Sequence, residues 1–125
     1  MNSQQEPAVA GGPVRRFKDP AYVEVASTLG ELRERIDSLD ERIVALLAQR
    51  AACVRDATRF KRDAFQVAAP ARQAQVFERV RALAAPHAEA FPGLPGIVEA
   101  TYRTLVGGFV AAEAQLFQDT ETIQP

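Results

Sequence analysis

The sequence predicts an all-α fold with three helices in each chain, one long and two shorter. Apolar residues recur at steps of three and four from position 29 to position 46, which is the spacing of one helical face. Pro70 and Pro95 each precede a further run with this period, and proline is common at the first position of a helix. Residues 22–25 alternate like a strand, but a single segment of this kind cannot make a sheet.

The long helix is predicted over residues 29–62, which contain no proline. Thr28 and Glu31 fit a capping box at its start. At ~1.5 Å per residue this helix is about 50 Å long, whereas a compact domain of this size has a radius of gyration near ~14 Å. Because its apolar face extends beyond one domain, we expect a homodimer. Cys53 lies on that face and is expected to be a small buried side chain.

The remaining elements follow from prolines and breaks in the period. Residues 63–69 are predicted to form a loop, the second helix to run from Pro70 to about Ala85, and the third from Pro95 to about Gln118. We expect one helical domain at 27–119, between a flexible N-terminal tail at 1–26 and a disordered C-terminal tail at 120–125.

Composition excludes several classes of function. The net charge of −1 gives no basic field for nucleic acid, no apolar run is long enough for a membrane, and the N-terminus does not resemble a secretory signal. We therefore expect a cytoplasmic protein with no nucleic acid or membrane partner. One cysteine and one histidine cannot make a Cys/His metal site. An enzyme with this sequence is expected to work without a metal, a cofactor or a protein nucleophile.

Two arginines and one lysine stand out on the predicted long helix. In a continuous helix Arg50 and Lys61 lie ~20° apart around the axis and ~16 Å apart along it, so both could approach a small anion. The alternative is that both extend to solvent or pair with acids of another helix. Arg33 lies ~25 Å from Arg50 and ~100° round the helix, so it can join that site only from an antiparallel partner chain. Its alternative is a surface arginine paired with Glu34 or Asp37.

Glu113 is the only ionisable residue between Arg103 and Asp119. If it faces inward, burial favours the protonated carboxyl, which is a hydrogen-bond donor. The alternative is that it faces water or pairs with a buried cation. Arg72 lies in the first turn of the second helix, where the helix dipole disfavours a cation. We therefore also consider Arg72 a candidate binding residue.

These residues occur in segments that resemble the all-α class of chorismate mutase over about residues 28–118. The resemblance is carried by LRERIDSLDERIVALLAQR, by RFK at 59–61, by AAPARQ at 68–73 and by the polar residue in the last helix. RFK and AP-x-R are especially similar to the isochorismate-pyruvate lyase branch, which has the same fold. The resemblance implies an intertwined homodimer with two equivalent sites and no cofactor. It also implies an isomerase of the shikimate pathway, in aromatic amino acid biosynthesis.

The resemblance also assigns roles to single residues. Arg50 and Lys61 match the cations of the long helix that hold the substrate, and Arg33 matches the arginine supplied by the partner chain. Arg72 matches the arginine at the start of the second helix. Gln73, beside Arg72, replaces an acidic residue of many mutases and can hydrogen-bond a substrate hydroxyl.

Glu113 falls where many members have a glutamine that hydrogen-bonds the ether oxygen of the substrate. The rearrangement of chorismate to prephenate is pericyclic, so the site must hold a dianion in its reactive conformer and stabilise charge on that oxygen. Glu113 can donate only when protonated, so we expect activity to fall as pH rises. Phe109 stands where many mutases carry a small polar residue. The substrate could therefore be a relative of chorismate, such as isochorismate.

Two other functions remain open from the sequence. An isochorismate-pyruvate lyase would form salicylate and pyruvate from a similar dianion on the same fold. A non-catalytic dimeric helical interaction or regulatory module would keep its seam apolar throughout, which Arg50 and Glu113 argue against.

Overall fold

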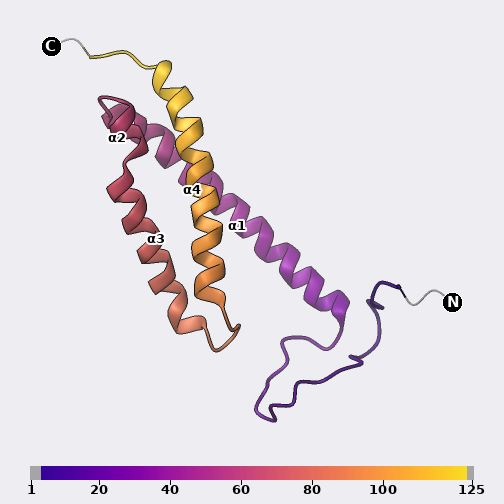
Figure 1. The fold of residues 1–125 in the computed structure, drawn as a ribbon. Helices are drawn as coiled ribbons and strands as arrows, with labels where there is room; N and C mark the ends of the chain where they lie inside the picture. The colour runs from indigo at the N-terminus through magenta and orange to yellow at the C-terminus, as the bar shows by residue number, and fades with distance from the viewer. Residues whose placement is uncertain (1–3, 124–125) are drawn as a thin grey trace. The chain divides into compact units, whose positions relative to one another are not determined.

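The structure is a computed structural model of the chain and describes residues 4–123. These residues form four α-helices and two 3₁₀ turns and contain no strand (Figure 1). In chain order the elements are α1 (Leu29–Ala57), η1 (Thr58–Phe60), α2 (Ala64–Ala68), α3 (Pro70–Ala84), η2 (Ala85–His87) and α4 (Leu94–Gln118). The predicted all-α class is confirmed, and the three predicted helices correspond to α1, α3 and α4.

The chain divides into two compact units, Met1–Ala48 and Gln49–Pro125. The first unit comprises the start of α1 and the irregular segment before it. Val9 O accepts a hydrogen bond from Gly30 N at 2.9 Å, and a Cβ at position 30 would lie 3.1 Å from that oxygen. Thr28 Oγ1 caps Glu31 N at 3.2 Å, whereas the Glu31 carboxylate reaches back to Ser27 N, not to Thr28 N. The tails predicted at 1–26 and 120–125 include residues 1–3 and 124–125, which lie outside the described part.

The predicted end of the long helix was wrong. Residue 57 ends α1, η1 follows, and Lys61 has extended backbone angles (φ −102°, ψ 139°). Side chains after Ala57 take up local backbone groups: Thr58 Oγ1 lies 3.2 Å from Val54 O, and Gln66 Oε1 accepts from Arg62 N at 2.7 Å. Such bonds compete with helix continuation. Lys61 therefore does not share a helical face with Arg50, and the angle computed for a continuous helix does not apply.

The predicted loop at 63–69 contains a short helix, α2. Asp63 is its N-cap, because Oδ1 accepts from Gln66 N at 2.9 Å. Ala69 ends α2 in the left-handed region (φ 44°), and Pro70 then starts α3. Helical periodicity did not predict α2, because five residues are too few to show a repeat.

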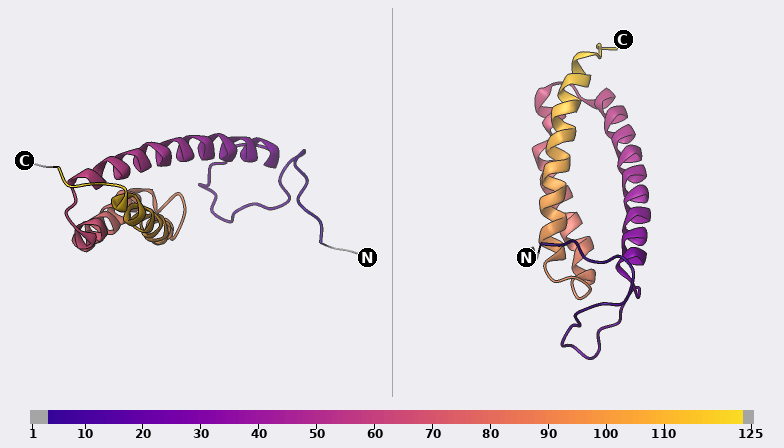
Figure 2. Two further views of the ribbon diagram at one scale, coloured as in Figure 1. Left: turned by 90° about the horizontal axis from the view of Figure 1, so that it is seen from above. Right: turned by 90° about the vertical axis from the view of Figure 1, so that its right-hand side faces the viewer.

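The core of the second unit lies where α3 and α4 pack side by side and α2 also contacts α4 (Figures 1 and 2). Its buried apolar side chains are small and aliphatic: Val67, Val80, Ala84 and Val106. Among residues 49–123, two polar side chains are buried, those of Thr58 and Glu113. Because the core is so small, these two polar residues are a large part of the buried interior.

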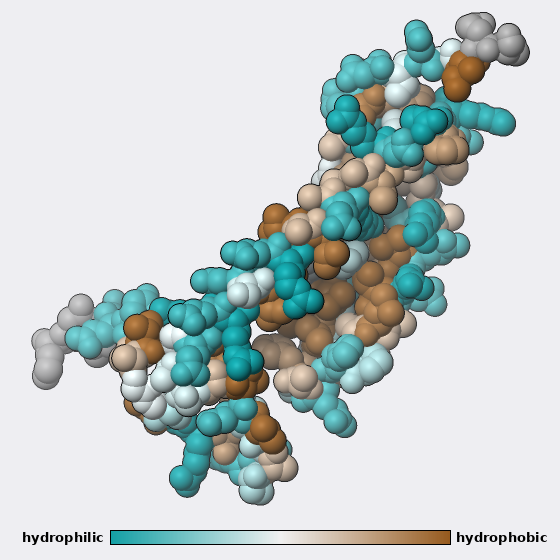
Figure 3. Space-filling view, turned by 180° about the vertical axis from the view of Figure 1, so that it is seen from behind, coloured by the Kyte–Doolittle hydropathy of each residue, from teal (hydrophilic) through white to brown (hydrophobic). Residues whose placement is uncertain are grey.

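No described residue of α1 is buried within the chain. The apolar face predicted for this helix is about half exposed: Ile36 54%, Leu39 49%, Ile43 51% and Leu46 60%. Apolar side chains also reach the surface between hydrophilic ones in Figure 3. Within the described part of the chain, no helix combines the length and apolar character needed to cross a membrane.

Candidate active site

A cavity of about 320 Å³ lies within the second unit. Its walls come from the C-terminal part of α1, from α2, from the start of α3 and from the middle of α4. The charged and amide side chains that line it are Arg50, Lys61, Arg72, Gln73 and Glu113. Five of the six residues proposed from the sequence therefore meet in one cavity, although they come from segments far apart in the chain.

Glu113 lies on α4 and is only 4% exposed. Its Oε2 is 3.5 Å from Lys61 Nζ and 3.2 Å from Thr58 Oγ1. Lys61 Nζ also donates to Gln66 O at 3.1 Å, which ties it to α2. Glu113 therefore faces inward, and its pairing with Lys61 is the arrangement that the sequence analysis gave as the alternative, a carboxyl group beside a buried cation.

Arg50 is half-buried between two aromatic rings of α4. Its guanidinium carbon lies 5.7 Å from the Tyr102 ring centroid and 5.5 Å from that of Phe109. Both distances suit cation–π contact, which restricts where the guanidinium can lie. Phe109 also lines the cavity, so the ring places an apolar surface beside the charge. Tyr102 was not predicted from the sequence as a site residue, although its two-turn spacing from Phe109 puts both rings on one face of a helix.

Arg72 and Gln73 lie in the first turn of α3. Arg72 is exposed at the cavity, whereas Gln73 is half-buried. Gln73 Nε2 donates a hydrogen bond to Ala68 O at the end of α2, so this amide nitrogen already has a structural role. Arg33 is exposed on α1 within the unit Met1–Ala48, while every residue that lines the cavity belongs to Gln49–Pro125.

Two residues near the cavity were missed or misjudged from the sequence. Cys53 was predicted to be buried, which was wrong: it is exposed and lines the cavity. It faces open space because residues of α1 contribute nothing to the buried core. Thr58 is 3% exposed and contacts Glu113, but a lone threonine in a helical stretch carries no sequence signal for this.

The charges of the cavity favour an anionic ligand. Arg50, Lys61 and Arg72 outnumber Glu113, which is the only carboxylate in the lining. Planar guanidinium groups match the geometry of carboxylates, and the apolar walls strengthen such interactions. Among residues 4–123, no three His, Cys, Asp or Glu side chains are grouped as metal ligands.

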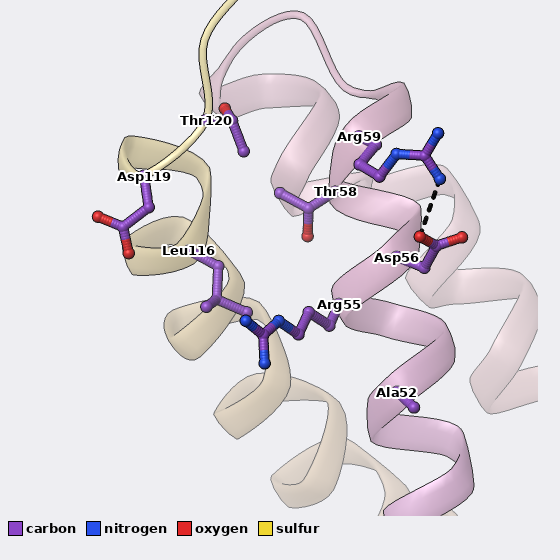
Figure 4. Close-up of a pocket in the computed structure, with 8 residues that line it drawn as sticks. All are labelled: Ala52, Arg55, Asp56, Thr58, Arg59, Leu116, Asp119 and Thr120. Atoms are coloured by element: carbon purple, nitrogen blue, oxygen red, sulfur yellow. Dashed lines mark hydrogen bonds and ion pairs between the residues drawn. The ribbon is translucent and has the colours of Figure 1, made fainter.

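A second hollow, of about 370 Å³, lies at the C-terminal ends of α1 and α4 (Figure 4). Its charged side chains are Arg55, Asp56, Arg59 and Asp119. Arg59 is already paired with Asp56 at 2.9 Å, and both are about two-thirds exposed. Balanced, solvated charges give an anion little reason to bind there. The cavity around Glu113 is therefore the better candidate.

A family model described as chorismate mutase type II matches residues 32–114, which is more than half of the chain. The matched range includes Arg33 and every residue that lines the cavity. No curated protein and no solved structure matches the chain.

Proposed function

The chain belongs to the chorismate mutase type II family, and we propose on that basis that it rearranges chorismate to prephenate. The observation that carries this proposal is the convergence of Arg50, Lys61 and Arg72 with the buried carboxyl group of Glu113 on one cavity. Chorismate is a small dicarboxylate with an ether oxygen between its two halves. Such a molecule needs cations for its carboxylates and a donor for its ether oxygen.

The proposed roles follow from the chemistry of each side chain. Arg50 and Arg72 bind the two carboxylates and hold the substrate in its compact conformer. As the ring carbon–oxygen bond breaks and the new carbon–carbon bond forms, negative charge develops on the ether oxygen. Lys61 and protonated Glu113 stabilise that charge by donating hydrogen bonds. No proton needs to be transferred in the rearrangement itself.

We also propose that the active form is a homodimer in which Arg33 of one chain completes the site of the other. The half-exposed apolar face of α1 supports this proposal, since a stable soluble helix buries such a face against a partner. Arg33 is exposed and lies in the family match, but it belongs to a different unit of the chain from the cavity. In a homodimer, Arg33 of the second chain would add a further cation to the site.

The test is to offer the purified protein chorismate and isochorismate separately. We expect loss of chorismate with formation of prephenate, and a loss of roughly 100-fold or more in kcat for Lys61→Ala. Arg59→Ala is the matched control, because Arg59 is a nearby cation that lies outside this cavity. Salicylate and pyruvate from isochorismate alone would select the lyase instead. Turnover of neither substrate would favour a non-catalytic helical module.

A further inference from the structure

We propose that Thr58 is a positioning residue that gives the two oxygens of Glu113 different tasks. With Lys61 it makes Oε2 the accepting oxygen and leaves Oε1 as the oxygen that carries the proton toward the substrate. The inference rests on the proposed function, in which Glu113 donates to an ether oxygen. It concerns a residue that touches Glu113 and is not among those that line the cavity.

The surroundings of Oε2 contain donors. Lys61 Nζ lies 3.5 Å from this oxygen, and an ammonium group has three donors and no acceptor. An oxygen that faces it is therefore stabilised in its unprotonated form. Thr58 Oγ1 lies 3.2 Å from the same oxygen. Its hydroxyl can add a second donor, so both neighbours favour an Oε2 without a proton.

Thr58 itself is held in place by α1. Its Oγ1 is also 3.2 Å from Val54 O, the carbonyl one turn earlier. The single hydroxyl proton thus lies between two acceptors, the backbone carbonyl and Glu113 Oε2. Since Thr58 is only 3% exposed, water does not compete freely for this proton. The hydroxyl is therefore restricted to this region, and the carboxyl plane of Glu113 is restricted with it.

The other oxygen, Oε1, makes no hydrogen bond within the described residues, whereas Oε2 is engaged by Thr58 and Lys61. Among residues 4–123, no buried side-chain oxygen or nitrogen lacks a hydrogen-bond partner, so Oε1 is not sealed off. Because Glu113 lines the cavity, we assign Oε1 to the side of the carboxyl group that faces it. A proton on neutral Glu113 is thus best placed on Oε1, where a substrate oxygen can accept it.

Removing the Thr58 hydroxyl should destabilise the carboxylate form of Glu113 relative to the neutral acid. A hydrogen bond to a carboxylate is stronger than one to the neutral acid, so its loss destabilises the carboxylate more. The fall in activity at high pH should then move to higher pH. The other titratable and charged groups at the cavity are Lys61 and Arg50, Arg72 on α3, and the Cys53 thiol; α2 contributes none. These groups are unchanged in a Thr58 variant.

The experiment compares Thr58→Val, which keeps the shape, with Thr58→Ser, which keeps the hydroxyl. For Thr58→Val we expect kcat to fall about tenfold, KM to stay within twofold, and the high-pH limb to move to higher pH. Thr58→Ser should match the wild type within twofold and keep its pH profile. Thr58→Ala removes the same hydroxyl and replaces the valine variant if that variant does not fold.

A second measurement does not depend on activity. In protein labelled with ¹³C at glutamate carboxyl carbons, the Glu113 signal is identified by its absence in Glu113→Gln. We expect this signal to titrate at higher pH in Thr58→Val than in the wild type or Thr58→Ser. An unchanged titration, or the same shift in both variants, would overturn the proposal. Failure of the wild type to use either substrate would overturn the proposed function alone, since the carboxyl titration would still be measured.

Discussion

Glu113 and Lys61 lie close together in the cavity, with 3.5 Å between Nζ and Oε2, and both have a role in the proposed chemistry. A carboxylate can only accept hydrogen bonds, so it opposes negative charge on a neighbouring ether oxygen. The protonated carboxyl stabilises that charge. On the proposed role of Glu113 we therefore expect activity to decrease as pH rises, whereas a general base would make it increase.

Glu113→Gln tests this direction of the pH dependence of activity. The amide donates at every pH, so we expect the high-pH fall in kcat to flatten while the activity at low pH changes little. The measurement is kcat and kcat/KM from pH 5 to 9 for both proteins, with Glu113→Ala as the control that removes the donor altogether. A fall in the glutamine variant as steep as in the wild type would contradict the role of Glu113.

Single residues differed in how readily the sequence revealed them. Arg50 and Glu113 could be predicted because a charge inside an apolar run is costly to bury without a partner. Thr58 could not, because threonine occurs in helices for many reasons and its partner Glu113 is 55 positions away. Cys53 was predicted to be buried on the apolar face of α1, but no described residue of this helix is buried within the chain.

At the scale of elements, the segment from η1 to the start of α3 places Lys61. Helical periodicity predicted α1, α3 and α4 because long amphipathic helices repeat their pattern several times. It could not predict the stop at Ala57 or the five-residue α2, since these depend on side-chain bonds to the backbone by Thr58, Asp63 and Gln66. The site cation Lys61 lies within this stretch.

Asp63→Ala tests the importance of α2. Loss of the N-cap should lower the free energy of unfolding by about 1 kcal/mol. It should also reduce kcat/KM, because the α2 carbonyl of Gln66 holds Lys61 Nζ at 3.1 Å. Urea unfolding and steady-state kinetics measure the two effects. Asp63→Asn retains a capping side chain and should lose little of either; equal losses in both variants would argue against capping as the cause.

A second prediction concerns the packing of α3 on α4. Glu99 on α4 accepts from Arg103 at 2.9 Å and from Arg81 of α3 at 3.2 Å. The hydrogen bond from Arg103, and then the charges of both arginines, hold the pKa of Glu99 below its ordinary value of 4.5. A carboxyl group with a lowered pKa stabilises the fold above 4.5, and this contribution is lost as pH falls through the lowered pKa.

Glu99→Gln should therefore lower the melting temperature slightly at pH 7, and the difference should shrink as pH falls from 4.5 toward 3. The effect is small because the group is solvated. Thermal unfolding of both proteins across this range is the measurement, and Glu89→Gln, outside any ion pair within the described residues, is the control. A difference that persists unchanged at pH 3 would exclude the charge as its origin.

At the scale of the whole molecule, one chain buries little. Among residues 4–123 the buried apolar side chains are four small aliphatic ones, and the apolar face of α1 stays about half exposed. Monomeric soluble proteins rarely leave such a face uncovered. The length and pattern of the helix predicted a partner from sequence alone, whereas the partner's contribution to the site depends on Arg33, which no single-chain pattern can place.

Subunit mixing tests the shared site directly. Arg33→Ala and Arg50→Ala should each be nearly inactive alone, because every site lacks one cation.

After the two variants exchange subunits, half of the dimers are mixed. In each mixed dimer, one site combines the intact Arg33 of one chain with the intact Arg50 of the other, while the second site carries both defects. We therefore expect recovery of about one quarter of the wild-type activity at equal concentrations. If Arg33 served the cavity of its own chain, mixing would restore nothing. If it lay only on the surface, Arg33→Ala would be active before mixing. Two Arg50→Ala preparations mixed in the same way control for recovery through handling.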